Sequence, residues 1–523
     1  MSFIAEHPLA SLSSAVVLFF AIRKLSQSFA GPLRRLPGPS GGHWFWGHEL
    51  IAFERPSGDA YTEWIDTCGQ TYKIKGAMFH PDILVTVDPG ALNHMLSKEA
   101  EKSDFIRTMT DRVVGKSLPY VSGDAHKRQR YQLSPFFTTQ ATRETFDMIK
   151  SCAQTVADRL RSEVTKSSGS MIMNLPDWIG RATLDIIGRF AFDFDFKCGE
   201  SNTAKTIQQA WNEQVKLAMQ RAGFIGLVVL RAFPWIVDLP IPAIQQEGAV
   251  KRAVRDVARK VIERGPSETK RKNLLSTLVT LASRGELDAS SDELLDHIST
   301  LVLVGHETTA GSLTWALYEL AKKPEYQTRL REEIKQLGRE PTYEDLMGRM
   351  PFLDAVMKEI FRHRPGSSHT ERVALKDDVI RLKNPVYNDR GDKITEIPIK
   401  AGQLIHIPSI SINHVKSVWG PDAEEFDPER WLDQSRIPSA SETCGGWNGT
   451  FIFSEGARMC IGYRLAILEF KVILSTYLRY FEFHDTGATI SHRFANTLQP
   501  YVVGDEAKGN QLPLRVSLVG GQK

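Results

Sequence analysis

The sequence predicts a mainly α-helical protein with a small β region. Apolar side chains recur at helical spacing through most of residues 140–263. A long apolar helix is expected from a capping-box pattern at residues 290–293 to about Lys323, where Pro324 would stop it. Short apolar runs predict strands at 83–87, 379–382, 394–399, 403–407 and 512–518. Because these strands are few and short, we expect one small sheet beside the helices.

Composition places the chain among ordinary globular proteins. It has 523 residues, of which 42% are hydrophobic and 24% charged, so it can bury a large core. The formal net charge of +3 argues against a nucleic-acid partner. The five cysteines are scattered and include no C-x-x-C pair, which suits a reducing compartment better than a disulfide framework.

The N-terminal segment carries the membrane signal. Residues 8–22 are uncharged and end in an apolar run, which Arg23 and Lys24 follow. The run is short for a transmembrane helix of about 20 residues, although apolar residues before it could extend it. Because the positive charge follows the apolar run, we expect residues 1–30 to be an anchor that leaves residues 31–523 in the cytosol. A cleaved signal peptide is the alternative.

One stretch, FSEGARMCIG, organises the rest of the chain. It begins at Phe453, and a long apolar helix pattern follows it directly. The free N–H groups and positive dipole end of that helix favour a thiolate at Cys460. Gly456 and Gly462 carry no Cβ, so the backbone can pass close to a flat group. Arg458 adds a permanent positive charge that suits a carboxylate.

This stretch resembles the haem-binding loop of the cytochrome P450 family, Phe-x-x-Gly-x-Arg-x-Cys-x-Gly, and meets every fixed position. The resemblance implies that Cys460 is the iron ligand of haem b. It also implies that Phe453, Gly456, Arg458 and Gly462 surround the cofactor. A buried structural cysteine in a glycine-rich turn is the alternative interpretation.

The middle of the predicted long helix, VGHETT from Val304, contains residues that are unfavourable inside a packed helix. An interior glycine costs roughly 1 kcal/mol relative to alanine, and polar side chains in an apolar helix are also costly. The stretch resembles the family's oxygen-binding motif, [Ala/Gly]-Gly-x-[Asp/Glu]-Thr, from which Val304 departs at the first position. The resemblance implies that Gly305 leaves room for dioxygen and that Glu307 and Thr308 are catalytic, delivering protons. A helix kink from threonine back-bonding is the alternative.

A basic helix is predicted to begin near Gly123. His126 and Arg130 are four residues apart and share one face of it. The helix resembles the family's Trp-x-x-x-Arg helix, which binds a haem propionate; here His126 stands in the tryptophan position and can still donate to a carboxylate. Arg372 matches another propionate-binding arginine of the family. A solvated basic helix is the alternative.

A structural ion-pair group is also predicted. Glu359 and Arg362 lie three apart on a helix, and Arg430 follows in an FDPERW stretch. These residues resemble the family's Glu-x-x-Arg helix and its later arginine, a triad that holds the underside of the haem. An exposed pair of little energetic value is the alternative.

Four segments are candidates for the substrate pocket: residues 104–120, the helix near Val304, residues 365–369 and residues 498–501. We expect residues 104–123 to form an irregular loop, which in the family helps to roof the pocket. The strongly apolar stretch at 224–242 is either a core helix or a segment that dips into the bilayer surface, and these are not exclusive.

The motifs run in the family's order from a proline-rich hinge at residues 36–42 to Cys460, so the resemblance covers nearly the whole chain. It implies the mainly α fold of a microsomal, fungal-looking monooxygenase on the endoplasmic reticulum membrane, of a kind found in secondary metabolism. The implied reaction inserts one oxygen atom from O2 into a lipophilic small molecule, by hydroxylation or epoxidation. Electrons would come from NADPH through a separate NADPH–cytochrome P450 reductase, which Lys127, Arg128 and Arg464 could dock.

Two other functions are compatible with the same fold. One is isomerisation or dehydration without dioxygen, and the other is non-catalytic binding of haem or a ligand. The presence of both Glu307 and Thr308 counts against each of them. The residues identify no particular substrate.

Overall fold

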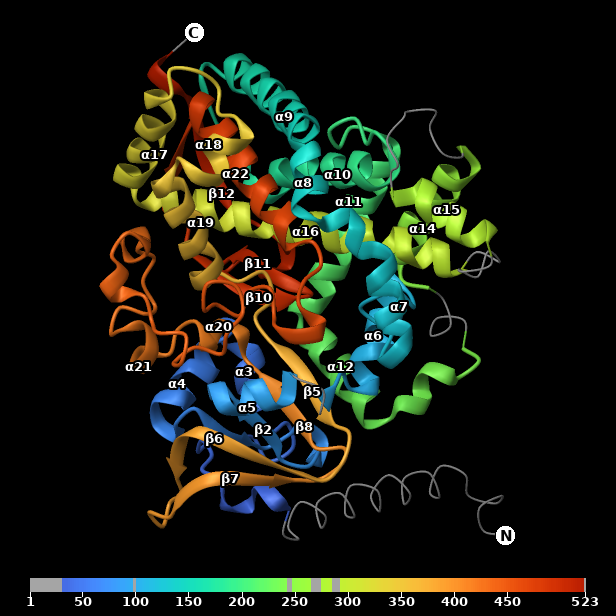
Figure 1. Ribbon diagram of the computed structural model, residues 1–523, viewed down its shortest axis with the longest axis vertical. Helices are drawn as coiled ribbons and strands as arrows, with labels where there is room; N and C mark the ends of the chain where they lie inside the picture. Colours follow the sequence, from blue (N-terminus) through green and yellow to red (C-terminus); the bar gives the residue numbers. More distant parts are fainter. Residues whose placement is uncertain (1–30, 97–99, 242–246, 265–273, 285–291, 522–523) are drawn as a thin grey trace.

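Helices make up most of the molecule, and strands gather mainly in its lower part in Figure 1. The computed structural model describes residues 31–96, 100–241, 247–264, 274–284 and 292–521. The predicted fold class, mainly α with a small β region, is confirmed. The predicted anchor, residues 1–30, lies outside the described residues, and within them no helix is both long and apolar enough to cross a bilayer.

The helix α16 (Asp292–Lys322) runs through the helical body, and most of its side chains are buried. It packs against α10 (Leu175–Phe192), α14 (Ala249–Arg264), α19 (Pro351–His363) and α22 (Tyr463–Tyr480). Its end agrees with the prediction, because Pro324 opens the next helix, α17 (Pro324–Gln336). Residues 290–291 of the predicted capping box lie outside the described part.

Residues 140–263 are mostly helical, as predicted. They contain α9 (Phe146–Lys166), α10, α11 (Asn202–Met219), α12 (Arg221–Ala232) and most of α14, with one strand, β4 (Ser170–Asn174), between α9 and α10. Further helices are α3 (Glu49–Glu54), α4 (Asp59–Cys68), α5 (Pro89–His94), α15 (Leu274–Ser283) and α18 (Tyr343–Gly348).

The apolar stretch at 224–242 is not a core helix. It forms most of α12 and the short 3₁₀ helix η5 (Pro234–Asp238). Within α12 only Phe224 and Val228 are buried, whereas the side chains of Ile225 and Leu227 are exposed. The other prediction for this segment, contact with a bilayer surface, therefore remains.

The strands form four small sheets in the described residues, so the single sheet that we expected is wrong. The largest has the order β1-β2-β8-β5-β3. Its strands are β1 (Thr71–Ile74), β2 (Ile83–Thr86), β8 (Leu404–Ile407), β5 (Thr370–Ala374) and β3 (Ala100–Glu101). β2 and β8 run parallel, with Leu84 opposite Ile405, and the other pairs are antiparallel. Two of the predicted strands are thus neighbours in this sheet.

Two of the other three sheets are hairpins of consecutive strands, and the third joins distant segments. β6 (Asp378–Tyr387) pairs with β7 (Lys393–Ile399), and β10 (Ile490–Ala495) pairs with β11 (Thr497–Val502). β12 (Pro513–Leu518) lies between β4 and β9 (Phe481–Asp485). The partners of β12 are set by tertiary packing, which leaves little signal in the local sequence.

Residues 104–123 are not an irregular loop throughout, as we expected. They begin with the helix α6 (Asp104–Val114), and only residues 115–122 are irregular before α7 (Gly123–Leu133). The Ser103 hydroxyl caps α6 by accepting the N–H of Ile106 at 3.2 Å. Gly115, at φ 93°, ends it. The sequence signal for this helix is a serine before an acidic first turn.

Candidate active site

The loop that carries Cys460 is closed on itself and fastened to the core. Cys460 donates its backbone N–H to the carbonyl of Phe453 at 2.8 Å. The Phe453 ring is buried and meets Phe361 of α19 edge-on, with ring centroids 5.6 Å apart. These contacts hold the cysteine just before α22, as the sequence predicts.

The Cys460 side chain is accessible, yet burial is the largest influence on its pKa. Both observations hold if the thiol faces a space inside the protein rather than the outer surface. Burial raises the pKa of the thiol, while the Gly462 N–H and the Arg130 charge lower it without prevailing. The Gly462 N–H thus favours the thiolate, as we expected of the helix start, but burial outweighs it in the loop alone. A metal ion would stabilise the thiolate, because a coordinating thiol is deprotonated outright.

The backbone around residue 456 requires glycine, independently of any cofactor. Gly456 has φ +67°, and a Cβ there would come within 2.7 Å of the Leu96 carbonyl oxygen. A Cβ at Gly462 would meet Phe137 at an ordinary 3.7 Å. Close approach of both glycines to a flat cofactor stays a prediction.

The centre of α16 also faces open space. Val304 is 45% exposed although it lies in the middle of a largely buried helix. One turn further on, the Thr308 hydroxyl donates to the Val304 carbonyl at 3.1 Å. A Cβ on Gly366 would lie 3.8 Å from the Thr308 Cβ, and the Gly366 carbonyl accepts the N–H of Leu498 at 3.1 Å. Two predicted pocket segments, 365–369 and 498–501, therefore meet beside Thr308.

The end of α6 reaches the same helix. The Lys116 N–H donates to the Asp296 carboxylate at 2.7 Å, and the Thr300 hydroxyl donates to the Val114 carbonyl at 3.3 Å. Asp296, Thr300 and Val304 are spaced four apart and share one face of α16. All four segments predicted to line the pocket are thus brought together along this face.

Gly305 has a packing role. A Cβ at this position would come within 2.7 Å of the Ile187 side chain, so glycine allows α10 to lie close to α16. The predicted role in leaving room for dioxygen stays a prediction. Glu307 pairs with His306, whose Nε2 lies 3.1 Å from its Oε1. The two side chains predicted to be catalytic are therefore adjacent in sequence but have different partners.

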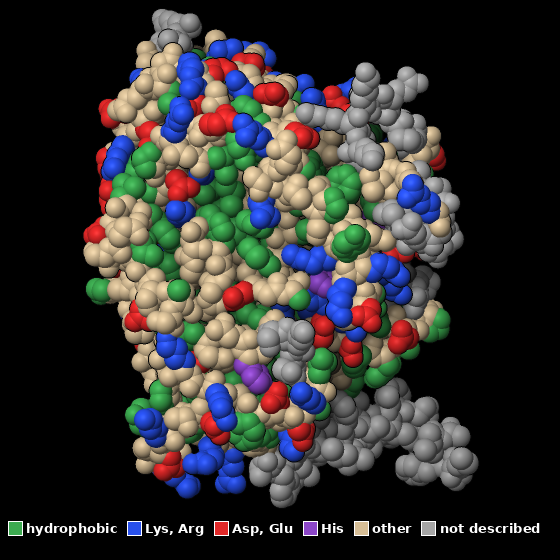
Figure 2. Space-filling model, in the orientation of Figure 1, with side chains coloured by type: hydrophobic (Ala, Val, Ile, Leu, Met, Phe, Trp, Pro, Cys, Tyr) green, Lys and Arg blue, Asp and Glu red, His purple; other side chains and the backbone are tan. Residues whose placement is uncertain are grey.

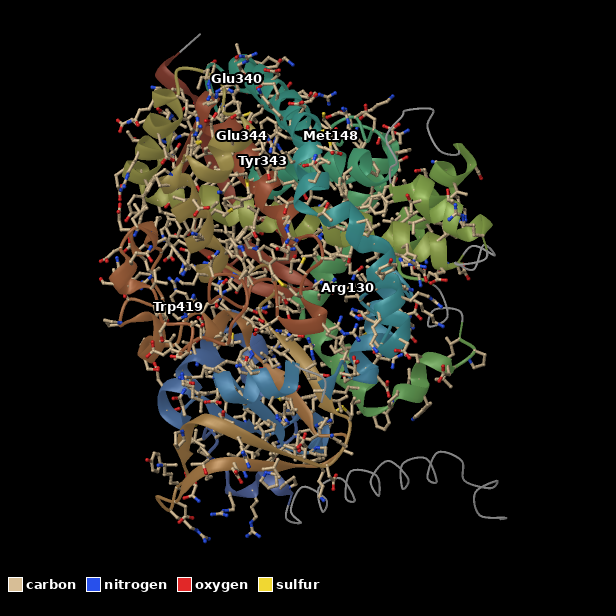
Figure 3. All side chains as sticks on the ribbon, viewed as in Figure 1. Arg130, Met148, Glu340, Tyr343, Glu344 and Trp419 are labelled. Atoms are coloured by element: carbon tan, nitrogen blue, oxygen red, sulfur yellow. The ribbon has the colours of Figure 1, made fainter. Side chains whose placement is uncertain are left out.

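A cluster of cations lies beside the Cys460 loop. Arg458 donates to the Glu101 carboxylate at 2.6 Å and to the Val121 carbonyl at 2.7 Å. Arg130 extends from α7 toward the centre of the molecule (Figure 3) and donates to the Met459 carbonyl at 2.8 Å. The predicted residues thus tie the start of α7 and the residues before it to the loop.

The pKa values in this cluster show an excess of positive charge. Burial, together with the charges of Arg458 and Arg130, lowers the pKa of His126 to about 4. Burial and Arg458 lower the pKa of Arg372 to about 10. Burial, Arg372 and Arg458 lower the pKa of Lys102 to about 7. No motif predicts this role for Lys102, because Arg372 and Arg458 come from distant segments.

These residues fit a haem. Two propionates would supply negative charge where crowded cations lose protons, and an accessible thiol inside the fold would supply the iron ligand. The groups that would hold the propionates are His126, Arg130, Arg372, Arg458 and the newly found Lys102.

The predicted ion-pair triad is confirmed and buried. Glu359 accepts from Arg362 at 2.7 and 2.9 Å, and Arg430 lies 3.8 Å from it; all three side chains are at most 1% exposed. The Trp431 indole also donates to Glu359 at 2.9 Å. An exposed pair is therefore the wrong interpretation.

Asn413 connects this triad to the cysteine loop. Its carbonyl accepts from Arg362 at 2.8 Å, and its side-chain oxygen accepts the N–H of Phe451 at 3.2 Å. Phe451 lies two residues before Phe453. The triad thus positions the loop through one side chain that no motif in the sequence identifies.

Comparison with known proteins agrees with this geometry. The family model for Cytochrome P450 matches residues 36–502. The chain is 30% identical over 526 residues to Cytochrome P450 monooxygenase 205 of Postia placenta, covering 96% of each chain. It is 30% identical over 546 residues to Cytochrome P450 monooxygenase claQ of Ampulloclitocybe clavipes, covering 98% of this chain and 99% of that protein.

Four observations indicate the same family. They are the pattern of the cysteine loop, the accessible thiol within the fold, the crowded cation cluster and the match over most of the chain. The protein belongs to the cytochrome P450 family and is a monooxygenase of that family.

Proposed function

We propose that this monooxygenase inserts one oxygen atom of O2 into a lipophilic small molecule, using electrons that a separate reductase takes from NADPH. The observation that carries the proposal is the accessible Cys460 thiol inside the fold, beside a cluster of cations whose positive charge the nearby Glu101 does not fully offset. Haem b, when bound there, supplies the reduction and cleavage of dioxygen.

The chain's own residues position the haem and supply protons. Cys460 holds the iron, and the cation cluster holds the propionates. Thr308 donates its one hydroxyl hydrogen to the Val304 carbonyl, so its oxygen lone pairs can accept a hydrogen bond from a water and hold that water in place. The exposed Val304 side chain beside it leaves an apolar surface for the substrate.

A lipophilic substrate is supported by the aromatic residues next to the Gly366 turn. The His369 ring lies 4.4 Å from the Phe494 ring and 4.8 Å from the His406 ring, measured between centroids. Burial lowers the pKa of His369 to about 4, so its imidazole is neutral at physiological pH. Neutral aromatic groups favour an apolar ligand over a charged one.

The endoplasmic reticulum membrane is the proposed location. Besides residues 1–30, support comes from exposed apolar side chains on two neighbouring segments: Ile225, Leu227 and Trp235 near α12, and Trp44. Trp46 and Phe53, close to Trp44 in sequence, pack on Phe224 of α12, with ring centroids 5.9 and 4.9 Å apart. Tryptophan and exposed aliphatic side chains are typical of a surface that lies in the bilayer interface.

A basic surface over α7 is the proposed docking site for the reductase. Figure 2 shows Lys and Arg side chains gathered over this helix. Lys127 and Arg128 are exposed there, and Arg130 of the same helix reaches the cysteine loop. An acidic partner docked on this surface would lie on the thiolate side of the haem.

Spectroscopy and reconstitution test the proposal. The reduced protein with carbon monoxide should show the red-shifted Soret band of a thiolate-ligated haem, and Cys460→His should lose it. With reductase and NADPH, some members of a lipophilic compound library should shift the haem spin state and gain one oxygen atom. A parent protein without that Soret band, or one that converts no compound of such a library, contradicts the proposal.

A further inference from the structure

Three polar side chains share one face of the largest sheet. Side chains alternate between the two faces along β5, so Glu371 points to one side and Arg372 to the other. His369, two residues before Glu371, lies on the Glu371 side, and His406 of β8 lies directly opposite Glu371 in the antiparallel pairing. Arg372 joins the cation cluster on one face, whereas His369, Glu371 and His406 gather on the other.

The two histidines belong to a short stack of rings with nitrogen atoms left to bind. Ring centroids are 4.8 Å apart for His369 and His406, and 4.5 Å apart for His406 and Tyr61. The His406 Nε2 is buried and has no hydrogen-bond partner among the described residues. The His369 Nδ1 lies 3.1 Å from the Ser368 hydroxyl, so its Nε2 is the ring nitrogen left for a further partner. Buried polar atoms of this kind are costly unless a water or a ligand satisfies them.

His369 and Glu371 face a space inside the protein. Both side chains are partly accessible, yet burial is the largest influence on the pKa of each. It lowers the pKa of His369 to about 4 and raises the pKa of Glu371. The Cys460 thiol combines accessibility and burial in the same way. Ser103 donates to one oxygen of Glu371, which leaves the other oxygen for a ligand.

This polar face lies within a small molecule's length of the open face of α16. A Cβ on Gly366 would lie 3.8 Å from the Thr308 Cβ. His369 follows Gly366 by three residues, a chain length of at most about 11 Å. One substrate can therefore contact His369 at one end and present a carbon atom to the space beside Thr308 at the other.

The charges around the polar face favour an uncharged group. Arg231 of α12 is occupied by Glu49, whose two oxygens accept from it at 2.6 and 2.5 Å, so its charge is not free for a carboxylate. An anion would also meet the Glu371 carboxyl group, and an unpaired buried ion is costly. A hydroxyl group, in contrast, can accept from an imidazole N–H and donate to a carboxyl oxygen at once.

We propose that His369, Glu371 and His406 form a binding site for a hydroxyl group of the substrate, which makes the substrate a lipophilic alcohol. The inference rests on the proposed function and deepens it, because it names the substrate class. Ser368 donates to the His369 Nδ1, the His369 Nε2–H donates to the substrate oxygen, and the substrate hydroxyl donates to Glu371. His406 offers a second ring nitrogen. These residues determine specificity by orienting the apolar part of the molecule toward Thr308, and they take no part in oxygen transfer.

Ligands that differ in one hydroxyl group test the proposal on the haem-loaded protein. Dodecan-1-ol is compared with dodecane, and adamantan-1-ol with adamantane, by the shift of the haem spin state and by calorimetry. At least one alcohol should bind about tenfold or more tightly than its hydrocarbon, which leaves the buried polar atoms unpaired. A purely apolar pocket would give the opposite order, because water solvates the hydrocarbon less well. If neither alcohol shows this preference, the proposal is wrong.

Substitutions test whether His369 causes the preference. His369→Leu should lower the ratio of alcohol to hydrocarbon affinity about fivefold or more, whereas His369→Gln, which keeps an N–H donor, should retain most of it. Phe494→Leu is the matched control, because it removes the ring that lies 4.4 Å from the His369 ring but no hydrogen bond. The ratio should survive in this control. Since the ratio compares two ligands of one protein, incomplete haem loading does not change it. A parental ratio in His369→Leu would contradict the assignment.

Charged analogues test whether the site is specific for a hydroxyl group. For the alcohol that binds better, the carboxylate and trimethylammonium analogues of the same skeleton should bind more weakly; neither trimethylammonium compound has a nitrogen lone pair for iron. Tighter binding of the carboxylate or of the ammonium compound would mean an anion site or a cation site and would overturn the proposal. A parent protein without the carbon-monoxide band contradicts the proposed function instead. A parent that has this band but no alcohol preference contradicts the present inference alone.

Discussion

At the scale of single residues, Thr308 is where proton delivery can be tested. Its hydroxyl donates to the Val304 carbonyl on the open face of α16. Thr308 is the residue of the oxygen-binding motif that carries a hydroxyl on this face. Thr308→Ala should keep the carbon-monoxide spectrum but lower product per NADPH by about fivefold or more, with more peroxide. Thr308→Ser should recover much of the yield.

The control for this change lies one turn along the same helix. Ser312 donates its hydroxyl to the Thr308 carbonyl at 3.1 Å, so Ser312→Ala removes a hydroxyl of α16 without removing the one at Thr308. Product, peroxide and NADPH are measured in one reaction. Coupling in Thr308→Ala equal to that in Ser312→Ala would show that protons travel by another route.

Lys102 carries a second prediction at this scale. In the haem-free protein the pKa of Lys102 is about 7, below the ordinary value of 10.5. Between these two pH values the unfolded chain therefore binds more protons than the folded protein. Stability of the haem-free protein should therefore rise with pH through that window, and Lys102→Met should reduce the rise. The check is the unfolding midpoint at several pH values.

Loss of Lys102 should also weaken haem retention, because one partner of the propionates disappears. Transfer of haem to apomyoglobin measures this, and it should be faster in Lys102→Met. Lys127→Met, which removes an exposed cation of α7, is the control and should transfer haem at the parent's rate. Equal transfer rates in both variants would place Lys102 outside the propionate site.

At the scale of elements, the triad around Glu359 joins α19 to the segments that carry Asn413 and Arg430. Glu359→Ala would leave the buried Arg362 without its carboxylate, although Arg430 keeps Asp422 at 2.9 Å; we expect a cost of about 3–5 kcal/mol. We expect little haem-loaded protein from this variant. Glu344→Ala, which breaks an exposed pair with Arg143, should load haem normally. A normal haem content in Glu359→Ala would contradict the structural role.

The sequence predicted those parts of the site whose chemistry is local. The loop around Cys460, the polar residues of α16 and the charges of the triad each occupy a few neighbouring positions, so their spacing is readable. The roles of Lys102 and Asn413 could not be predicted, because their partners lie on distant segments. The sheet count is wrong because two hairpins, β6–β7 and β10–β11, form sheets of their own. Glycine at 305 and 456 is predicted to leave space for a ligand, which stays a prediction; the structure adds a packing reason, because a Cβ would meet Ile187 or Leu96.

At the scale of the whole molecule, the basic surface over α7 should control electron supply. Lys127→Glu and Arg128→Glu together would reverse two exposed charges and should slow reduction by the reductase, most strongly at low salt. The carbon-monoxide spectrum and dithionite reduction should not change. Stopped-flow reduction measures the effect, and Lys508→Glu, a reversal of another exposed charge, is the control. An unchanged rate of reduction would place docking elsewhere.

The two proposed membrane contacts can be separated because one precedes the described chain and the other is a folded surface. Deleting residues 1–30 should weaken flotation with liposomes but leave binding through Ile225, Leu227, Trp235 and Trp44. Ile225→Asp with Leu227→Asp, made in the deleted chain, should remove that binding, since each aspartate opposes insertion of α12 into the interface. Asn202→Asp with Thr206→Asp, at exposed positions of α11, adds the same two negative charges away from the apolar surface and is the control. If the deletion changes nothing, residues 1–30 are not the anchor. If the aspartates in α12 reduce liposome binding no more than the control does, the apolar surface does not contact the membrane and has another partner.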